Sequence, residues 1–435
     1  MIPQLLAKLK IEALNEMQEL ALSTAAEGND MLLLSPTGSG KTLAFLLPIL
    51  LKLDPQKIGV QCLVIVPSRE LAIQIESVFR QMGSGFKVNC CYGGHKMQTE
   101  RNNLDQAPAV LIGTPGRLTH HIRKKTLDLS TASFLVLDEF DKALEFGFQK
   151  DMEFIIAKMS ALKQRILTSA TQGLAIPAFT GIVNPTIVNY LTTQAAPPKL
   201  TIKAVRAEAQ DKFEALLKLI GSKSQQAILV FCNHREAVDR ISEILSNRNM
   251  LHDVFHGGLE QEDRNKALVK FRNGTHKLLI TTDLASRGLD IPEIECVIHY
   301  QVPSTENAFI HRNGRTARMH AEGVAYLILG ENEKQPYYIK DDLEIEALEA
   351  MTEAMPSTDW VTLYVSAGKK DKINKVDIVG LFLQKGGLAK EELGLIEVHD
   401  FTTFVAVKRN KVNQLLTLLS NEKLKKKTVK IELAH

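Results

Sequence analysis

Short apolar runs rich in Val, Ile and Leu recur along this chain, and longer mixed segments separate them. The runs do not alternate strictly between apolar and polar residues, which is typical of strands buried on both faces of a parallel sheet. The segments between them, such as residues 69–82, have the periodicity of amphipathic helices. The pattern therefore predicts an α/β layer architecture. The predicted strands of the first half are residues 31–34, 62–66, 110–112, 134–137 and 166–167.

The same pattern occurs a second time, with predicted strands at residues 228–231, 277–281, 296–300 and 324–329. A polar stretch with two prolines separates the two sets. We therefore expect one α/β domain at residues 1–192, a linker at residues 193–200 and a second α/β domain at residues 201–355. The length of 435 residues leaves room for a third, smaller unit at residues 356–435.

The composition, with 45% hydrophobic and 24% charged residues, is that of a globular protein. None of the five cysteines forms a C-x-x-C pair, which favours a reduced cytosolic interior over disulfides or a zinc site. No basic region followed by an apolar stretch begins the chain, and no apolar run reaches the roughly 20 residues that span a bilayer. We expect a cytoplasmic protein without a membrane partner. No signature of self-association stands out, so a monomer is the default expectation.

Charge is unevenly distributed. Residues 357–435 contain 14 Lys and Arg against 9 Asp and Glu, whereas residues 1–356 contain 39 against 41. The last segment should therefore attract polyanions locally. The alternative is a well-solvated domain without such a partner.

A glycine-rich loop, Ser35-Pro-Thr-Gly-Ser-Gly-Lys41-Thr42, follows the first predicted strand and opens a predicted helix. It matches the phosphate-binding pattern G-x-x-x-x-G-K-[ST] except at Ser35. Backbone N–H groups and the helix N-terminus favour phosphate there, Lys41 should reach the β- and γ-phosphates, and Thr42 should hold Mg²⁺. The alternative is a Gly/Ser turn without a ligand. The predicted nucleotide-binding residues of the loop are Ser35, Thr37, Gly38, Ser39, Gly40, Lys41 and Thr42.

Two adjacent acids, Asp138 and Glu139, end the predicted strand at residues 134–137. An acid at the carboxyl end of a buried strand is the expected position of a Mg²⁺ ligand, which we assign to Asp138. Glu139 would activate the attacking water as a general base. Simple turn residues are the alternative for each acid alone. With Lys41, these residues form the predicted catalytic set of the first half.

Further motifs accompany these two. Those of the first half are Pro67-Ser-Arg-Glu-Leu-Ala72, Gly93-Gly94, Thr114-Pro-Gly-Arg117 and Ser169-Ala-Thr171. Those of the second half are Val230-Phe-Cys-Asn233, His256-Gly257 with Gln261 and Arg264, Thr282-Asp-Leu-Ala-Ser-Arg-Gly-Leu-Asp290 and His311-Arg-Asn-Gly-Arg-Thr-Ala-Arg318.

Motifs in this order resemble those of the DEAD-box RNA helicases. The resemblance implies two tandem RecA-like domains with parallel sheets and an ATP-dependent enzyme that locally unwinds short RNA duplexes. Arg315 and Arg318 would be arginine fingers on the γ-phosphate, and Asp290 would contact the ribose. Gln18 resembles the adenine-reading glutamine, with a helix-surface residue as the alternative. For Arg312, a surface salt bridge remains the alternative.

The resemblance also implies that Ser169 and Thr171 couple the acidic motif to RNA. The RNA contacts would be mainly to the sugar-phosphate backbone, which carries no base code, and contacts to the 2′-OH would favour RNA over DNA. Two positions depart from the family pattern: Phe140 replaces Ala in the acidic motif, and Ala317 replaces Gly in the last motif. The RNA-binding residues implied for the core are Arg69, Gly94, Thr114, Gly116, Arg117, His256, Gly257, Gln261, Arg264 and Thr282, while Arg287 serves either RNA or the closed interface.

The C-terminal segment is predicted to run strand, helix, strand, strand, helix, strand, which suggests a small α+β domain like an RRM. Thr402 stands where a stacking aromatic is expected, although Phe404 remains. Its motifs, Thr362-Leu-Tyr-Val-Ser-Ala-Gly-Lys-Lys370, Asp377-Ile-Val-Gly380, Ile396-Glu-Val-His399 and Phe404-Val-Ala-Val-Lys-Arg409, resemble the specificity domain of DbpA-type bacterial helicases.

This second resemblance implies a tether to a hairpin of large-subunit ribosomal RNA, with a role in ribosome assembly on pre-ribosomal particles. Lys369, Lys370, Lys408 and Arg409 are the expected phosphate contacts, and solvated basic residues are the alternative. Two other functions remain open for the whole chain. One is an ATP-gated RNA clamp or chaperone with weak catalysis, and the other is a DNA helicase with the same two-domain core.

Overall fold

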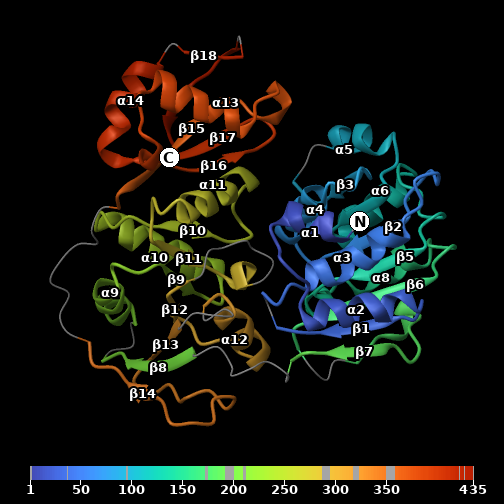
Figure 1. Cartoon of the computed structure of the whole chain (residues 1–435). Helices are drawn as coiled ribbons and strands as arrows, with labels where there is room; N and C mark the ends of the chain where they lie inside the picture. Colours follow the sequence, from blue (N-terminus) through green and yellow to red (C-terminus); the bar gives the residue numbers. More distant parts are fainter. Residues whose placement is uncertain are drawn as a thin grey trace. The chain divides into compact units, whose positions relative to one another are not determined.

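The computed structural model describes residues 2–36, 38–94, 97–171, 175–191, 200–208, 212–286, 294–316, 323–348, 358–420, 422–425 and 427–434. The chain divides into two compact units near residue 197. The first unit holds one sheet with its helices, and the second holds a similar sheet followed by a small C-terminal domain (Figure 1).

The first unit is built on a seven-stranded sheet in the order β3-β4-β2-β5-β6-β1-β7, in which every pair of neighbours is parallel. The strands β1, β2 and β4 are buried along their whole length, as expected for a sheet covered on both faces. The strands are β1 Met31–Leu34, β2 Cys62–Ile65, β3 Val88–Cys91, β4 Val110–Gly113, β5 Phe134–Leu137, β6 Gln164–Ser169 and β7 Thr186–Asn189.

Helices cover both faces of this sheet. Because side chains alternate across a strand, Leu33 and Val64 pack into one core with α3 and α4, whereas Leu34 and Leu63 pack into the other with α6 and α8. The helices of the first unit are α1 Ile2–Leu9, α2 Glu16–Ala26, α3 Lys41–Lys52, α4 Arg69–Met82, α5 Met97–Leu104, α6 Pro115–Arg123, α7 Phe140–Glu145, α8 Gln149–Ile156 and the 3₁₀ turn η1 Ala178–Thr180.

The second unit repeats this design with a seven-stranded parallel sheet in the order β10-β11-β9-β12-β13-β8-β14. Its strands are β8 Leu200–Arg206, β9 Ile228–Phe231, β10 Asp253–Phe255, β11 Leu278–Thr281, β12 Cys296–His299, β13 Gly323–Leu329 and β14 Glu344–Ile345. Its helices are α9 Phe213–Ser222, α10 Arg235–Asn247, α11 Gln261–Arg272, α12 Glu306–Asn313 and the 3₁₀ turn η2 Asp283–Ser286.

The C-terminal domain has an antiparallel sheet in the order β16-β17-β15-β20, with a separate two-stranded hairpin formed by β18 and β19. One face of the sheet packs under two helices around Leu363, Phe382 and Leu415. The strands are β15 Trp360–Val365, β16 Leu393–Val398, β17 Thr403–Lys408, β18 Lys423–Leu424, β19 Lys427–Thr428 and β20 Ile431–Leu433. The helices are α13 Lys375–Gly380 and α14 Val412–Leu419, with short turns η3 Lys369–Asp371, η4 Leu381–Lys385, η5 Lys390–Glu392 and η6 Arg409–Lys411.

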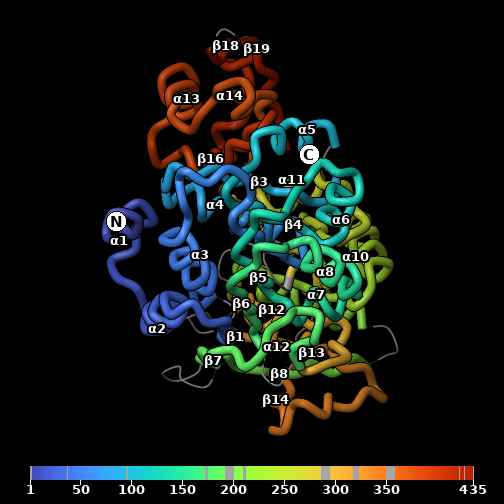
Figure 2. Tube along the Cα trace, turned by 90° about the vertical axis from the view of Figure 1, so that its right-hand side faces the viewer, coloured from blue at the N-terminus to red at the C-terminus, as the bar shows by residue number. Residues whose placement is uncertain are grey.

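The other face of this C-terminal sheet contacts the end of α11. The Thr362 hydroxyl lies 2.6 Å from Thr275 Oγ1 and accepts a 3.1 Å hydrogen bond from Asn273 Nδ2, and Arg272 pairs with Glu397 at 3.2 Å. Figures 1 and 2 both show α13 and α14 on the side of the sheet away from α11. The open sheet face, on which an RRM usually stacks bases, is therefore covered in part by protein.

The predicted fold class is confirmed: two RecA-like sheets precede a small α+β domain with the expected strand and helix order. Sequence reasoning missed β3, β7, β8, β10 and β14, which are short or lie toward the sheet edges. Leu200, placed in the predicted linker, is instead the first residue of β8. The domain boundaries at residues 192/193 and 355/356 fall outside the described residues and stay predictions. Within the described residues, no helix is long and apolar enough to cross a bilayer.

Candidate ATP- and RNA-binding site

The phosphate-binding loop connects β1 to α3. Gly38 and Gly40 adopt φ values of 83° and 89°, a region that favours glycine. Lys41 Nζ donates to the Ser35 carbonyl at 2.7 Å, and the Ser35 and Ser39 hydroxyls share a hydrogen bond. Since Gly40 has no side chain to cap α3, backbone N–H groups of its first turn can face a phosphate. Thr37 lies outside the described residues.

Gln18 and Asn15 contact this loop from the start of α2. They form a reciprocal capping box, in which the Gln18 amide donates to Asn15 Oδ1 at 2.9 Å and the Asn15 amide donates to Gln18 Oε1 at 3.0 Å. The Gln18 side chain also donates to the Gly40 carbonyl at 3.3 Å, and the Asn15 side chain donates to the Ser39 carbonyl at 3.1 Å. Gln18 is buried, so it is not the helix-surface residue of the alternative interpretation.

The acidic motif lies two strands away at the same edge of the sheet, since β6 separates β1 from β5. Thr168, on β6, donates a hydrogen bond to Asp138 and accepts one from the Glu139 amide at 3.2 Å. Burial raises the pKa of the Asp138 carboxyl above its ordinary value, while the Thr168 hydrogen bond and the positive charge of Lys41 oppose that rise. Lys41 and Asp138 are therefore electrostatically coupled across the predicted phosphate site.

The Ser-Ala-Thr motif ends β6, between the loop and the acids. Ser169 Oγ accepts from the Thr171 amide at 3.0 Å, and Thr171 Oγ1 donates to Asp141 Oδ2 at 3.4 Å. The Ser35 amide donates to the Ser169 carbonyl at 3.1 Å. Hydrogen bonds thus join all three motifs of this sheet edge. Phe140 is buried in the core behind them, as expected for a ring at that position.

The predicted RNA-binding residues of the first unit follow β2, β3 and β4, the three neighbouring strands at the far end of the same sheet edge. Arg69 begins α4, and its guanidinium is so close to Gly94 that a Cβ added there would come within 2.5 Å of Arg69 Nη1. Thr114 precedes α6, where Gly116 is exposed, and Arg117 Nε donates to the Tyr92 carbonyl at 3.0 Å. The structure therefore brings all five predicted residues together.

A buried acid missed by sequence reasoning holds this group in place. The Glu100 side chain is 0% exposed and accepts hydrogen bonds from the Tyr92 amide at 3.2 Å and from His121 Nε2 at 2.7 Å, and its Oε2 lies 3.2 Å from Arg117 Nε. His121 Nδ1 lies 2.8 Å from the Thr126 hydroxyl. Nothing in the polar sequence around Glu100 predicts its burial.

Cys91, Glu100 and His121 form a group that could hold a metal ion, with ligand atoms within 4.8 Å of one another in the described part of the chain. The Glu100 carboxylate is, however, already used by three donors. Burial raises the pKa of the Cys91 thiol well above its ordinary value, which opposes the thiolate that a metal needs. We therefore interpret the group as a hydrogen-bonded buried cluster. All five cysteines are free.

In the second unit, three predicted RNA-binding residues meet at the ends of adjacent strands: His256 and Gly257 follow β10, and Thr282 follows β11. His256 Nε2 lies 3.0 Å from Asp239. Gln261 begins α11 and donates to Asn265 at 2.7 Å. Arg264, by contrast, is only 2% exposed, because it shares the inward helix face with Ala267, Leu268 and Phe271.

Arg312 is fully buried, so the alternative of a surface salt bridge is wrong. Its guanidinium pairs with Asp283 at 2.5 Å, donates to the Gln301 carbonyl and to Asn233 Oδ1, and lies over the Phe231 ring. This network joins α12 to the ends of β9 and β12 and to η2. Arg315 follows α12 and is also buried. Arg318, Arg287 and Asp290, as well as Ala317, lie outside the described residues.

The four predicted RNA contacts of the C-terminal domain do not form one patch. Lys369 and Lys370 follow the end of β15, whereas Lys408 pairs with the beginning of that strand, because β15 and β17 are antiparallel. Lys408 lies 4.5 Å from the centroid of the Trp360 ring, and Arg409 donates to the Thr358 carbonyl at 2.6 Å. Lys408 and Arg409 are thus engaged with the segment that leads into the domain.

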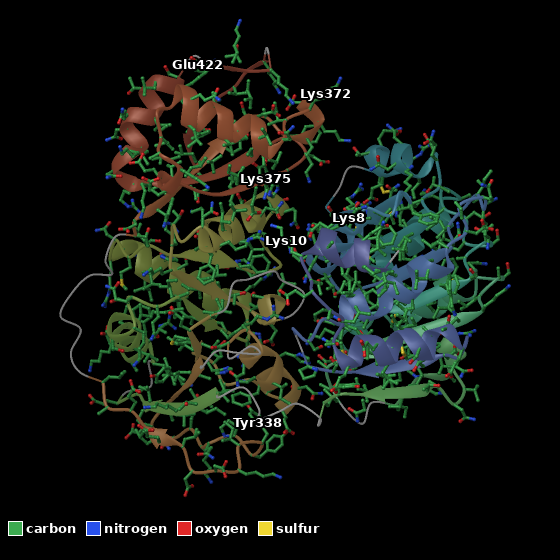
Figure 3. The ribbon with its side chains drawn as sticks, in the orientation of Figure 1. Lys8, Lys10, Tyr338, Lys372, Lys375 and Glu422 are labelled. Atoms are coloured by element: carbon green, nitrogen blue, oxygen red, sulfur yellow. The ribbon has the colours of Figure 1, made fainter. Side chains whose placement is uncertain are left out.

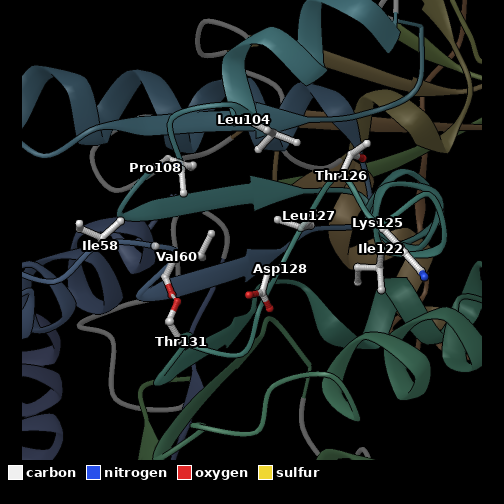
Figure 4. A pocket seen from close by; sticks show the side chains of 12 residues that line it. Ile58, Val60, Leu104, Pro108, Ile122, Lys125, Thr126, Leu127, Asp128 and Thr131 are labelled. Atoms are coloured by element: carbon white, nitrogen blue, oxygen red, sulfur yellow. Dashed lines mark hydrogen bonds between the residues drawn. The ribbon is translucent and has the colours of Figure 1, made fainter.

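The hollow shown in Figure 4 is not part of these sites. It is lined by residues that precede strands of the first sheet, such as Val60 before β2, Pro108 before β4 and Leu127 before β5. It therefore lies at the opposite edge of the sheet from the phosphate-binding loop.

Comparison with family models gives three matches in chain order. Residues 15–176 match the DEAD/DEAH box helicases, residues 211–320 match the helicase conserved C-terminal domain, and residues 362–433 match the DbpA RNA binding domain. The matches correspond to the first sheet, the second sheet and the C-terminal domain.

The similarity to two known proteins extends over the same regions. The ATP-dependent RNA helicase DbpA of Escherichia coli (strain K12) is 32% identical over 427 residues, covering 96% of this chain and 93% of that protein. The DbpA helicase of Bacillus subtilis (strain 168) is 28% identical over 454 residues, covering 97% and 94%.

Among solved structures, S. cerevisiae Dbp5 bound to RNA and ADP BeF3 has a TM-score of 0.67 at 27% identity, covering 76% of this chain and 88% of that one. Mss116p bound to ssRNA and AMP-PNP has a TM-score of 0.68 at 25% identity, covering 76% and 72%. This chain therefore belongs to the DEAD-box family of ATP-dependent RNA helicases and contains the DbpA RNA-binding domain of the DbpA-type members.

Proposed function

We propose that this helicase is tethered by its C-terminal domain to structured RNA of the large ribosomal subunit and remodels short duplexes near that anchor during ribosome assembly. The observation that carries the ATP-driven part is the hydrogen-bonded sheet edge in the first unit. There Thr168 bonds both acids of the acidic motif, and Thr171 bonds Asp141. A change at the nucleotide can therefore move the Ser-Ala-Thr motif.

The residues at this edge fit ATP with Mg²⁺. Lys41 and the N–H groups of the loop would bind the phosphates, while the Thr42 hydroxyl and the Asp138 carboxylate offer the hard oxygen ligands that Mg²⁺ prefers. When bound, Mg²⁺ would neutralise charge on the β- and γ-phosphates. Glu139 would take the proton from the attacking water, and Gln18 would read the base from its position against the loop. From the second unit, Arg315 and Arg318 would stabilise charge on the γ-phosphate.

The RNA strand would run along the far end of the same edge. Arg69, Gly94, Thr114, Gly116 and Arg117 offer backbone N–H groups, a hydroxyl and two guanidinium groups, which suit phosphate oxygens and carry no base code. In the second unit, His256, Gly257 and Thr282 would contact RNA, with Gln261 beside them. Arg264, on the inward face of α11, would support this RNA-binding surface of the second unit. Ser169 and Thr171 would couple RNA binding to hydrolysis.

The tether rests on the match of residues 362–433 to the DbpA RNA binding domain and on the excess of basic residues there. Its physical value is effective concentration: a specific anchor on a short linker raises the local concentration of nearby duplex to the order of mM. Because part of the sheet face contacts α11, the RNA would bind at the loops that carry Lys369 and Lys370. We further propose that the protein acts as a monomer in the cytoplasm.

The test is ATPase activity of the full chain without RNA, with a generic single strand, and with a large-subunit ribosomal RNA fragment. We expect the ribosomal fragment to activate at a much lower concentration than the generic strand, and this preference to be lost when residues 357–435 are removed. Equal activation by both RNAs would contradict the tether. Equal rates with and without RNA would contradict RNA-dependent hydrolysis. A DNA strand of the generic sequence tests the preference for RNA.

The clamp alternative is separated from catalysis by Glu139→Gln. A catalyst should retain ATP binding, since Lys41 and the loop are intact, and should lose steady-state hydrolysis by about 10²–10⁴-fold, the usual contribution of a general base. A chain whose slow hydrolysis is the same before and after the substitution would instead be a clamp.

A further inference from the structure

An exposed aromatic ring stands beside the lysines of the C-terminal domain. Phe401 is 67% exposed, although a large apolar side chain in such a position costs free energy of hydration. It lies in the turn between β16 and β17, where the His399 amide donates to the Thr402 carbonyl at 2.8 Å. Asp400 and Phe401 form the two-residue tip of this turn.

The tip is held against the loop that carries Lys369 and Lys370. The Lys369 amide donates to the His399 carbonyl at 2.8 Å, and the Lys370 amide donates to the Asp400 carbonyl at 2.8 Å. A Cβ at Gly368 would come within 2.3 Å of the His399 carbonyl oxygen, so the two loops pack with no space between their backbones. Phe401, Lys369 and Lys370 are therefore carried on two loops whose backbones are hydrogen-bonded to each other.

Acidic side chains of the protein neutralise only part of the positive charge around Lys369 and Lys370. Lys425 pairs with Asp377 at 2.7 Å and Lys427 with Asp371 at 2.6 Å. Among the residues that the structure describes, neither Lys369 nor Lys370 has a carboxylate within ion-pair distance. Lys372, which precedes α13, and Lys375, its first residue, are also exposed (Figure 3). The lysines around the tip thus exceed the acids near it, and the excess suits phosphate groups.

The sheet face on which such a domain usually stacks bases is covered in part by the rest of the second unit. Phe404 is only 2% exposed, with the rings of His399 and Tyr364 at centroid distances of 5.5 and 5.9 Å. Thr362, on the same face, is bonded to Asn273 and Thr275. A base that stacks on this domain can therefore use Phe401, which is an exposed ring on a loop hydrogen-bonded to the loop that carries Lys369 and Lys370.

We propose that Phe401 is a stacking platform for an unpaired base of the anchored RNA, with Lys369 and Lys370 neutralising the phosphates that flank that base. The inference rests on the proposed function, because it assigns a subsite to the same tether. A ring whose face is open to solvent stacks on any base, and cations beside it bind the backbone. The subsite would thus recognise a single-stranded loop nucleotide rather than a paired stem.

The test uses the full chain and two RNA hairpins of equal length, one from large-subunit ribosomal RNA and one unrelated, each with 2-aminopurine at an unpaired loop position. Phe401→Leu keeps an apolar side chain but removes the aromatic ring, and Phe401→Tyr restores a ring. Leu418→Ala, at a residue 48% exposed on α14, is the matched control for loss of an exposed apolar group. Stimulation of the ATPase by a saturating generic strand reports on the helicase core.

We expect Phe401→Leu to weaken hairpin binding by roughly 5- to 150-fold, the range that one stacked base contributes, and to abolish the change in 2-aminopurine fluorescence. Phe401→Tyr should restore both signals, and Leu418→Ala should match the native chain. Phe401→Leu should leave the salt dependence of binding unchanged, whereas Lys369→Ala should lower its slope by about 0.9 for each phosphate that the protein no longer neutralises, or somewhat less on an unpaired strand. Stimulation of the core by the generic strand should not change in any of these variants.

A Phe401→Leu chain that binds both hairpins as tightly as the native chain would overturn the proposal, and so would one that keeps the fluorescence change. Failure of the proposed function looks different. If the native chain binds the ribosomal hairpin no more tightly than the unrelated one, the ribosomal tether is rejected, while the comparison of Phe401→Leu with Phe401→Tyr on either hairpin still decides the role of the ring.

Discussion

Replacement of Glu100 should show whether the RNA-binding end of the first sheet depends on one buried carboxylate. The side chain is 0% exposed, and three donors surround it: the Tyr92 amide, Arg117 and His121. Removing one member of a buried, hydrogen-bonded charge group costs about 3–5 kcal/mol, because the remaining groups stay buried without a partner. Glu100→Ala should therefore lower the local stability of α5 and α6 by about that amount.

Glu100→Gln is the graded comparison. The amide keeps the shape and one accepting oxygen but turns an NH₂ group toward a donor, so a smaller cost of about 1–3 kcal/mol is expected. The measurement is hydrogen exchange of the α5 and α6 amides in the full chain, which reports local opening free energies. Glu153→Ala, at an exposed acid on α8, is the control and should change stability by less than about 0.5 kcal/mol.

Glu100→Ala should also weaken RNA binding. Arg117 is held between the Tyr92 carbonyl and Glu100, so its loss of orientation should raise the RNA concentration for half-maximal ATPase stimulation about tenfold, or ~1.4 kcal/mol. The rate at saturating RNA should change little. If the α5 and α6 amides of Glu100→Ala exchange their hydrogens as slowly as those of the native chain, the argument that Glu100 stabilises these helices is refuted. An unchanged RNA concentration dependence would refute the role of Arg117 orientation.

Two further predictions concern buried titratable groups. Asp138→Asn should abolish RNA-stimulated hydrolysis yet raise the melting temperature of the first domain by about 2–4 °C per kcal/mol gained. The pKa of Asp138 is raised in the folded state, so at a pH above the ordinary carboxyl pKa the ionised side chain destabilises the fold. Asn carries no charge and removes this cost. A lower melting temperature in Asp138→Asn would contradict this reasoning. Burial lowers the pKa of His299 to about 3, so the folded state takes up its proton less readily than the unfolded state, and stability should fall as the pH drops from 6.5 toward 3, by up to about 1.4 kcal/mol per pH unit. Urea unfolding across this pH range should show that the free energy of unfolding depends less steeply on pH in His299→Gln than in the native chain. Identical pH profiles in the two proteins would count against a lowered pKa of His299 as the cause.

Much of the architecture could be predicted from the chain alone. The apolar runs at β1, β2, β5 and β9 are buried strands, and the phosphate-binding loop lies between a strand and a helix as its pattern requires. Strands buried on both faces need continuous apolar residues, and a glycine-rich phosphate loop needs residues that tolerate positive φ. These demands are local, so they are visible in the sequence.

The strands that sequence reasoning missed have weaker local signals. β3 reads Val-Asn-Cys-Cys and lies at the edge of its sheet, and β10 has only three residues. On α11, the resemblance implies an RNA contact for Arg264, and only the structure shows that Arg264 is buried on the inward face of the helix. For Arg312, the sequence left a surface salt bridge open, whereas the fold buries the guanidinium among four partners at the ends of β9 and β12 and in η2.

The kind of sheet, the phosphate loop, the two acids and the order of the motifs can therefore be predicted from the chain alone. The position of β6 between β1 and β5, by contrast, depends on tertiary structure, and because of it the Ser-Ala-Thr motif bonds both the loop, through Ser169, and Asp141, through Thr171. Tertiary structure also decided that Glu100 is buried under Arg117 and that Phe401, rather than Phe404, is the exposed ring. Strand order, burial and contacts across long chain separations depend on the packing of whole elements, and no local pattern in the chain encodes them.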